Sequence, residues 1–179
     1  MSLSNKELAI LDLLAYSEGT LGRSQNGYDV VFGYRVIVGW NENSTIAHGL
    51  NNWVSSGSVV SSAAGRYQFI AKTWVGINNG VNVPLSKTNQ DNAAIRKIKE
   101  RLGGLSINDI DGRDYFYNVL QALAPEWASI PLTKTITVGG KTRYRGKSYY
   151  DGENGNGAKG TPEKYFEIYS TALKLYNNQ

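Results

Sequence analysis

The segment from Ser4 to Gly19 constrains the fold most, because it carries signals for both ends of one helix. Ser4 and Glu7 have the spacing of a capping box, in which each side chain bonds to the other residue's backbone N–H. Gly19 is typical of the residue that ends a helix. The pattern predicts a helix from about Asn5 to Glu18. Its apolar residues recur at helical spacing: Leu8, Ile10, Leu11, Leu14 and Ala15.

The rest of the chain alternates helical patterns with two strand-rich regions. Tyr28–Phe32 and Arg35–Trp40 are rich in Val, Ile and aromatic residues, which predicts two strands within 28–40. A hairpin with a tight Gly139-Gly140 turn is predicted over 135–145. Because most of the pattern is helical, we expect an α+β fold with a small antiparallel sheet. Four more helices are predicted: 65–78, Ser86 to Arg101, 111 or 112 to Pro125, and one that starts at Thr161-Pro162.

Composition excludes several classes of chemistry. The 179 residues include no cysteine and one histidine, so cysteine nucleophiles, disulfides and multi-histidine metal sites are excluded. The Asp151–Gly160 loop has glycines where calcium ligands would be needed, so we interpret it as a plain loop. We expect the protein to use no metal and no cofactor. The net charge of +4 favours an anionic partner, but the basic residues match no nucleic-acid-binding motif. No apolar run is long enough to cross a membrane.

Glu18 is the candidate catalytic acid. It follows Leu11 by seven positions and Leu14 by four, so all three share the core-facing side of the predicted helix. Burial favours the neutral carboxyl, and the C-terminal end of a helix disfavours negative charge. Both effects raise a pKa toward the range that general acid catalysis needs. From periodicity alone, a half-exposed structural glutamate at a helix end is the more common case.

A series of segments resembles the family of the bacteriophage lambda endolysin. Ala15-Tyr16-Ser17-Glu18-Gly19-Thr20 resembles that family's active-site segment. Further segments match in order and spacing, and together they span roughly residues 7–131. They are Asn26-Gly27-Tyr28-Asp29-Val30-Val31, Ala64-Gly65-Arg66-Tyr67-Gln68, Gln90-Asp91, Ile98-Lys99-Glu100-Arg101 and Trp127-Ala128-Ser129-Ile130-Pro131.

The resemblance implies a lysozyme-like fold over residues 1–179 and lytic transglycosylase activity on peptidoglycan. Such enzymes cut the β-1,4 bond between N-acetylmuramic acid and N-acetylglucosamine. The muramyl 6-hydroxyl is the nucleophile and a 1,6-anhydro end results. One carboxyl, here Glu18, then serves as acid and base. The expected partner is the glycan strand, bound by a monomer that neither binds nucleic acid nor inserts stably in a membrane.

The matching motifs also suggest residues that bind the substrate. Gly65 permits a close approach of sugar to backbone, and Gln68 offers both a donor and an acceptor to an N-acetyl group. For Tyr67 and Gln68 the alternatives are packing beneath a helix and capping it. Aromatic rings can stack on sugars, but Trp74 fits the pattern of a helix core and is not expected to do so. His48 lies in a polar loop, and nothing supports it as a catalytic base. The predicted set is Tyr28, Asp29, Gly65, Tyr67, Gln68, Trp127 and Ser129, with Trp53 and Tyr149 as further stacking candidates.

Two other functions remain open at this stage. A hydrolytic muramidase needs a second carboxylate opposite Glu18, and the candidates are Asp29, Glu42 and Asp91, of which Asp29 is the best. A non-catalytic wall-binding module is the third possibility.

Residues 132–160 depart from the family. This predicted insertion could form a lid, lengthen the cleft or recognise one type of wall.

The N-terminus does not have the shape of a signal peptide, because Asp12 interrupts its apolar stretch and no basic segment precedes it. We therefore expect synthesis in the host cytoplasm and action at the wall. Passage through a holin pore, or delivery by a phage particle or secretion system, would account for that route.

Overall fold

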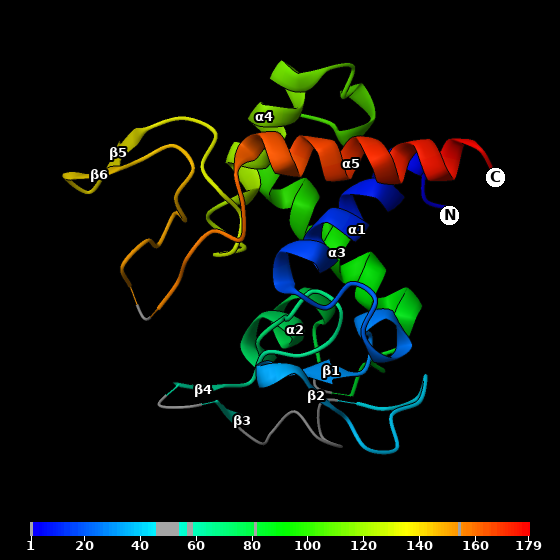
Figure 1. Ribbon diagram of the computed structural model, residues 1–179. Helices are drawn as coiled ribbons and strands as arrows, with labels where there is room; N and C mark the ends of the chain where they lie inside the picture. The colour runs from blue at the N-terminus through cyan, green and yellow to red at the C-terminus, as the bar shows by residue number, and fades with distance from the viewer. Residues whose placement is uncertain (1, 46–53, 57–58, 81, 154) are drawn as a thin grey trace. The chain divides into compact units, whose positions relative to one another are not determined.

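The computed structural model describes residues 2–45, 54–56, 59–80, 82–153 and 155–179 (Figure 1). Trp53 and His48 lie outside the described residues. The chain divides into two compact units. Unit 1 comprises Met1–Ser17 and Ile98–Gln179, and unit 2 comprises Glu18–Lys97.

The first helix, α1, covers Asn5–Glu18 and confirms the predicted bounds. The capping box is formed as expected. Ser4 N donates to Glu7 Oε2 at 2.9 Å, and Glu7 N donates to Ser4 Oγ at 3.2 Å. Gly19 follows with φ +72°, the left-handed conformation that ends a helix most easily when no Cβ is present. The interior of unit 1 includes Ile10, Leu13 and Leu14 of this helix, each 0% exposed.

Unit 1 is completed by two helices that pack on each other and by a hairpin. The helices are α4 (Arg113–Leu123) and α5 (Pro162–Asn177). Phe116 of α4 stacks on Tyr169 of α5, with ring centroids 5.0 Å apart. Thr161 caps α5 by accepting from Lys164 N, which confirms the predicted start. A short 3₁₀ helix, η4 (Ile107–Asp109), precedes α4.

The hairpin consists of β5 (Ile136–Val138) and β6 (Lys141–Arg143). Val138 pairs with Lys141 and Ile136 with Arg143, so the turn is Gly139-Gly140 as the sequence predicts. The strands of this hairpin end two residues earlier than expected, at Arg143 rather than Arg145.

Unit 2 holds two further two-stranded antiparallel sheets and a helix. The first pairs β1 (Val30–Val31) with β2 (Arg35–Val36), and the second pairs β3 (Val54–Ser56) with β4 (Val59–Ser61). The helix is α2 (Ala71–Asn78). A longer helix, α3 (Lys87–Leu102), begins at the predicted cap, where Asn89 N donates to Ser86 Oγ at 3.1 Å. Its last residues belong to unit 1.

Two predicted elements are wrong in extent. The region 28–40 forms only two-residue strands, because the 3₁₀ helix η2 (Phe32–Tyr34) separates them and another, η1 (Ser24–Gly27), precedes them. The helix expected over 65–78 begins only at Ala71. Residues 65–68 make a tight turn instead, with φ +76° at Gly65 and φ +49° at Gln68, values that a right-handed helix does not accept.

The α+β prediction is confirmed, since helices dominate and the sheets are small and antiparallel. Among the described residues, no helix combines the length and apolar character that crossing a membrane requires. Trp74 is 1% exposed and faces the interior as predicted, whereas Trp127, a predicted substrate-binding residue, is only 4% exposed, so little of its ring is available to a sugar.

Candidate active site

Glu18 is the last residue of α1 and is half-buried. Its neighbour Ser17 is 0% exposed and lies 2.6 Å from Ser129 Oγ and 2.9 Å from Tyr165 OH, oxygen to oxygen. Tyr165 OH in turn donates to the carbonyl of Ser129 at 2.9 Å. These bonds fix the last turn of α1 within unit 1. Ser129 therefore anchors the helix that presents Glu18, and its contact with substrate stays a prediction.

The chain beyond Glu18 is fixed by a second hydroxyl. Thr20 is 0% exposed and its Oγ1 donates to the carbonyl of Arg66 at 2.5 Å. Arg66 lies in the tight turn 65–68, and its guanidinium donates to the carbonyl of Asn26 at 2.6 Å. The Glu18–Thr20 corner and the 65–68 turn are thus joined within unit 2.

Gly65 cannot be replaced by a larger residue without displacing Gln90. An added Cβ would stand 2.2 Å from Gln90 Oε1, well inside van der Waals contact, at a φ of +76°. The structure therefore gives a reason for glycine at position 65 that the sequence did not predict: Gly65 makes room for the buried side-chain amide of Gln90. The close approach of a sugar to Gly65 stays a prediction.

Gln90 satisfies three backbone groups with one side chain. Its Oε1 accepts from Arg66 N at 2.8 Å. Its Nε2 donates to the carbonyls of Tyr28 at 2.9 Å and Leu85 at 2.8 Å. The side chain is 2% exposed, so these bonds form away from water, where an unpaired polar group is costly.

Beneath the turn, Asp91 accepts hydrogen bonds from two predicted site tyrosines. Tyr28 OH donates to Asp91 Oδ1 at 2.8 Å and Tyr67 OH donates to the same oxygen at 2.6 Å. Burial, reinforced by the charge of Asp91, raises the pKa of both phenols, so both stay protonated and keep donating. Arg66 lies over the ring of Tyr28, 5.2 Å from its centroid. Tyr67 is 1% exposed, which supports packing rather than stacking on a sugar.

Gln68 and Asp29 lie beside this cluster. Gln68 Nε2 donates to the carbonyls of Gly65 at 2.9 Å and Val30 at 3.3 Å, so its amide nitrogen braces the turn while Oε1 accepts no bond from the described residues. Asp29 is 4% exposed. Its Oδ2 accepts from Ser24 Oγ at 2.7 Å, and its Oδ1 has no hydrogen-bond partner among the described residues.

The structure brings five predicted residues of unit 2 together around the turn, namely Tyr28, Asp29, Gly65, Tyr67 and Gln68. Trp127 and Ser129 belong to unit 1. Tyr149, the further stacking candidate, has its ring 4.6 Å from the guanidinium carbon of Arg143.

Sequence reasoning missed the roles of Gln90, Arg66 and Thr20. Gln90 gave a detectable signal: Ala93 and Ala94 follow it by three and four positions, so a polar residue falls on the buried side of α3. Arg66 and Thr20 gave none, because their bonds join residues that are 46 positions apart.

Replacing Gln90 with Leu should lower the free energy of unfolding by about 3 kcal/mol or more, since three buried backbone groups lose their partner. Chemical denaturation would measure this change. Asn92→Leu, an exposed amide two positions along the same helix, is the control and should have little effect. A Gln90→Leu variant as stable as the parent would contradict the bracing role.

The amino-acid sequence is similar to known proteins over most of its length. The sequence model of the endolysin family matches residues 8–147. The endolysin of Escherichia phage lambda is 31% identical over 136 residues, which are 73% of this chain and 80% of that protein. The family match extends past Pro131 into the β5–β6 hairpin.

Two solved structures have the same fold. The bacteriophage lambda lysozyme complexed with a chitohexasaccharide gives a TM-score of 0.65 at 24% identity over 96% of both chains. A second structure of the lysozyme from bacteriophage lambda gives a TM-score of 0.58 at 21% identity, over 99% of this chain and 96% of that one. These matches confirm the lysozyme-like fold. With its sequence match covering most of its length, the chain belongs to the endolysin family, whose members are lysozyme-like enzymes that lyse bacterial cell walls.

Proposed function

We propose that this chain is a peptidoglycan lytic transglycosylase in which Glu18 is the only catalytic carboxyl. The substrate would be the β-1,4 bond between N-acetylmuramic acid and N-acetylglucosamine. The related lambda lysozyme is complexed with a chitohexasaccharide, which supports a glycan substrate here as well.

The main support for this proposal comes from the hydrogen bonds that the other carboxylates of residues 18–97 already accept within the protein. Residues 18–97 contain four of them: Glu18, Asp29, Glu42 and Asp91. Glu42 Oε2 accepts from Lys87 N at 2.9 Å, at the start of α3. Asp91 holds two tyrosine hydroxyls, and Asp29 is buried against Ser24. Glu42 and Asp91 therefore have structural roles, and so does one oxygen of Asp29, whose Oδ1 has no partner among the described residues.

Two-carboxylate hydrolysis requires a second group that reaches the anomeric carbon or a water beside it. Asp29, the best candidate for that group, is only 4% exposed. A buried carboxylate that already accepts from Ser24 is poorly placed to contact either. The single-carboxyl reaction needs no such partner.

In the proposed reaction Glu18 first donates a proton to the glycosidic oxygen, and the bond between that oxygen and muramyl C1 breaks. The resulting carboxylate then takes the proton of the muramyl 6-hydroxyl while that oxygen bonds to C1. Glu18 recovers its proton and no water is consumed. The products are a free N-acetylglucosamine 4-hydroxyl and a 1,6-anhydro muramyl end.

Mass spectrometry of digested peptidoglycan tests the reaction type. We expect new muramyl ends that are lighter by one water than reducing ends, because the 6-hydroxyl replaces water as nucleophile. Reducing ends alone would show a hydrolytic muramidase instead.

Glu18→Gln should lower the rate of wall lysis by about 10²–10⁴-fold, the usual contribution of a general acid, while binding to insoluble wall persists. Turbidity loss and co-sedimentation with wall fragments measure the two effects. Glu42→Gln is the matched control, since glutamine can still accept from Lys87 N. Lysis retained in Glu18→Gln would favour a different catalytic group, and a parent protein that binds wall without lysing it would favour a binding module.

Asp29→Asn separates the two enzymatic mechanisms. We expect its lysis rate to fall less than about tenfold, because the side chain is buried and asparagine can still accept from Ser24, whereas removing a general base costs about 10²–10⁴-fold. Initial rates should be measured at a temperature where circular dichroism shows the variant folded. A hundredfold loss in the folded variant would support the hydrolytic pair of Glu18 and Asp29.

A further inference from the structure

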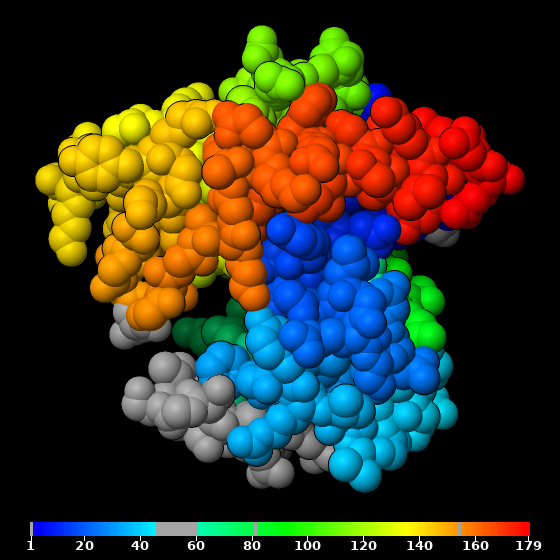
Figure 2. All heavy atoms as spheres, viewed as in Figure 1, coloured from blue at the N-terminus to red at the C-terminus, as the bar shows by residue number. Residues whose placement is uncertain are grey.

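A segment of unit 1 carries more positive charge than the whole chain. Residues 133–150, called the basic arm below, contain five Lys or Arg residues and no Asp or Glu. Since the net charge of the chain is +4, the remaining residues sum to −1. The arm includes the β5–β6 hairpin, and its yellow and orange atoms lie beside the N-terminal end of α5 (Figures 1 and 2).

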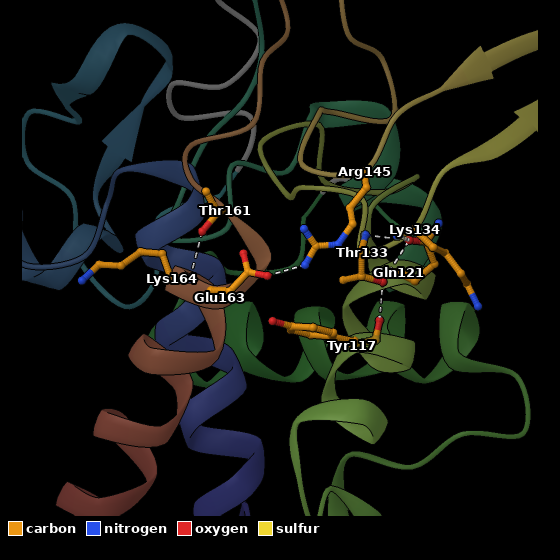
Figure 3. Close-up of polar contacts among 8 residues, drawn as sticks. All are labelled: Tyr117, Gln121, Thr133, Lys134, Arg145, Thr161, Glu163 and Lys164. Carbon is orange, nitrogen blue, oxygen red and sulfur yellow. Dashed lines mark hydrogen bonds and ion pairs between the residues drawn. The ribbon is translucent and has the colours of Figure 1, made fainter.

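The base of the arm is tied to α4 and α5 of unit 1 (Figure 3). Gln121 Oε1 of α4 accepts from Thr133 N at 2.8 Å and from Lys134 N at 3.1 Å. Thr133 Oγ1 donates to the carbonyl of Tyr117 at 2.9 Å. On the other side, Arg145 pairs with Glu163 of α5, and this bond lowers the pKa of Glu163 to about 2, so the pair is charged at neutral pH.

The returning strand is fixed in the same way. Leu132 N donates to the carbonyl of Lys147, and Gly146 N donates to the carbonyl of Leu132, both at 2.8 Å. Ser148 is 1% exposed and its Oγ donates to the carbonyl of Ala128 at 2.5 Å. The segments on both sides of the hairpin are thus held at the base of the arm.

The basic arm presents charges and an aromatic ring to solvent. Lys134, Lys141 and Lys147 are exposed and have no ion-pair partner among the described residues. Tyr144 is 62% exposed. The arm therefore exposes positive charge together with an aromatic ring.

A pocket of about 310 Å³ lies between the hairpin and the loop that follows it. Lys141, Arg143 and Tyr144 line it from the hairpin, and Asp151 and Glu153 line it from the loop. Arg143 Nη2 is 3.5 Å from Glu153 Oε1, so those two charges partly offset each other. The side chains of Lys141 and Asp151 have no such partner among the described residues, and they offer opposite charges to one pocket.

We propose that this pocket binds the peptide stems of peptidoglycan. A stem that is not crosslinked carries carboxylates and a free amine, so it complements Lys141 and Asp151 at once, while Tyr144 can cover its apolar parts. A phosphate polymer or a nucleic acid carries only negative charge, and Asp151 and Glu153 would repel it. The proposal rests on the proposed function, because it supplies the substrate with a second point of recognition.

Titration with a soluble stem peptide tests the pocket directly. The probe is N-acetyl-L-alanyl-γ-D-glutamyl-meso-diaminopimelate, whose N-terminus is blocked as it is in the wall, used with its side-chain amine free and with that amine acetylated. Binding is followed by NMR shifts at low ionic strength, because salt screens exposed charges. Lys141→Gln should raise the Kd of both peptides about two- to fivefold, the range for one exposed charge pair. Asp151→Asn should raise the Kd of the free-amine peptide alone.

Lys174→Gln and Asp111→Asn remove one exposed charge of each sign outside the arm, and should leave both Kd values unchanged. Equal binding of the two peptides, or a Kd that neither pocket variant changes, would overturn the proposal. So would tighter binding of a short DNA duplex than of the peptide, with a further gain in Asp151→Asn, since that result identifies a general polyanion surface.

Lysis assays separate this proposal from the proposed function. Lys141→Gln should slow cleavage of intact peptidoglycan and leave cleavage of glycan strands stripped of peptides by an amidase unchanged. An equal loss on both substrates would contradict stem recognition. If the parent protein cleaves neither substrate, the proposed function fails, while the peptide titration still decides what the pocket binds.

Discussion

The buried amide of Gln90 is the interaction on which the organisation of unit 2 depends. It joins the 65–68 turn, the carbonyl of Tyr28 and the carbonyl of Leu85 before α3, three segments that are far apart in the sequence. Its neighbour Asp91 holds Tyr28 and Tyr67 from the same helix. Two adjacent residues of α3 therefore position the turn, both tyrosines and, through Arg66, the backbone that Thr20 contacts.

Glu18 stands in sequence between two residues whose hydroxyls are fully buried. Ser17 bonds to Ser129 and Tyr165, and Thr20 bonds to the carbonyl of Arg66. A catalytic carboxyl gains from such anchoring, because a proton must be delivered along one direction and over a short distance. The Ser-Glu-Gly-Thr segment thus combines the proposed catalytic residue, a helix end and two anchors in four positions.

The sequence predicted best what depends on neighbours along the chain. The capping box at Ser4 and Glu7, the Thr161 cap and the Gly139-Gly140 turn are local signals, and each element lies where they indicate. The helix predicted over 65–70 is wrong because Gln90, some 25 positions away, stabilises a turn where propensity favours a helix. Burial was equally hidden: nothing near Tyr67 or Asp29 in the sequence shows that both side chains are covered. The family motifs indicated residues of unit 2 that lie together, but they did not reveal that most of these residues brace one another.

In the basic arm, the residues that hold it in place differ from the residues that face solvent. Gln121, Ser148 and the Arg145–Glu163 pair secure its base, whereas the side chains of Lys141, Tyr144 and Asp151 are exposed and line the pocket. Substitutions at such exposed positions usually change stability by less than about 0.5 kcal/mol. Substitutions there can therefore change what the pocket contacts at little cost in stability, so the specificity proposed for the pocket can vary while the fold of unit 1 stays the same.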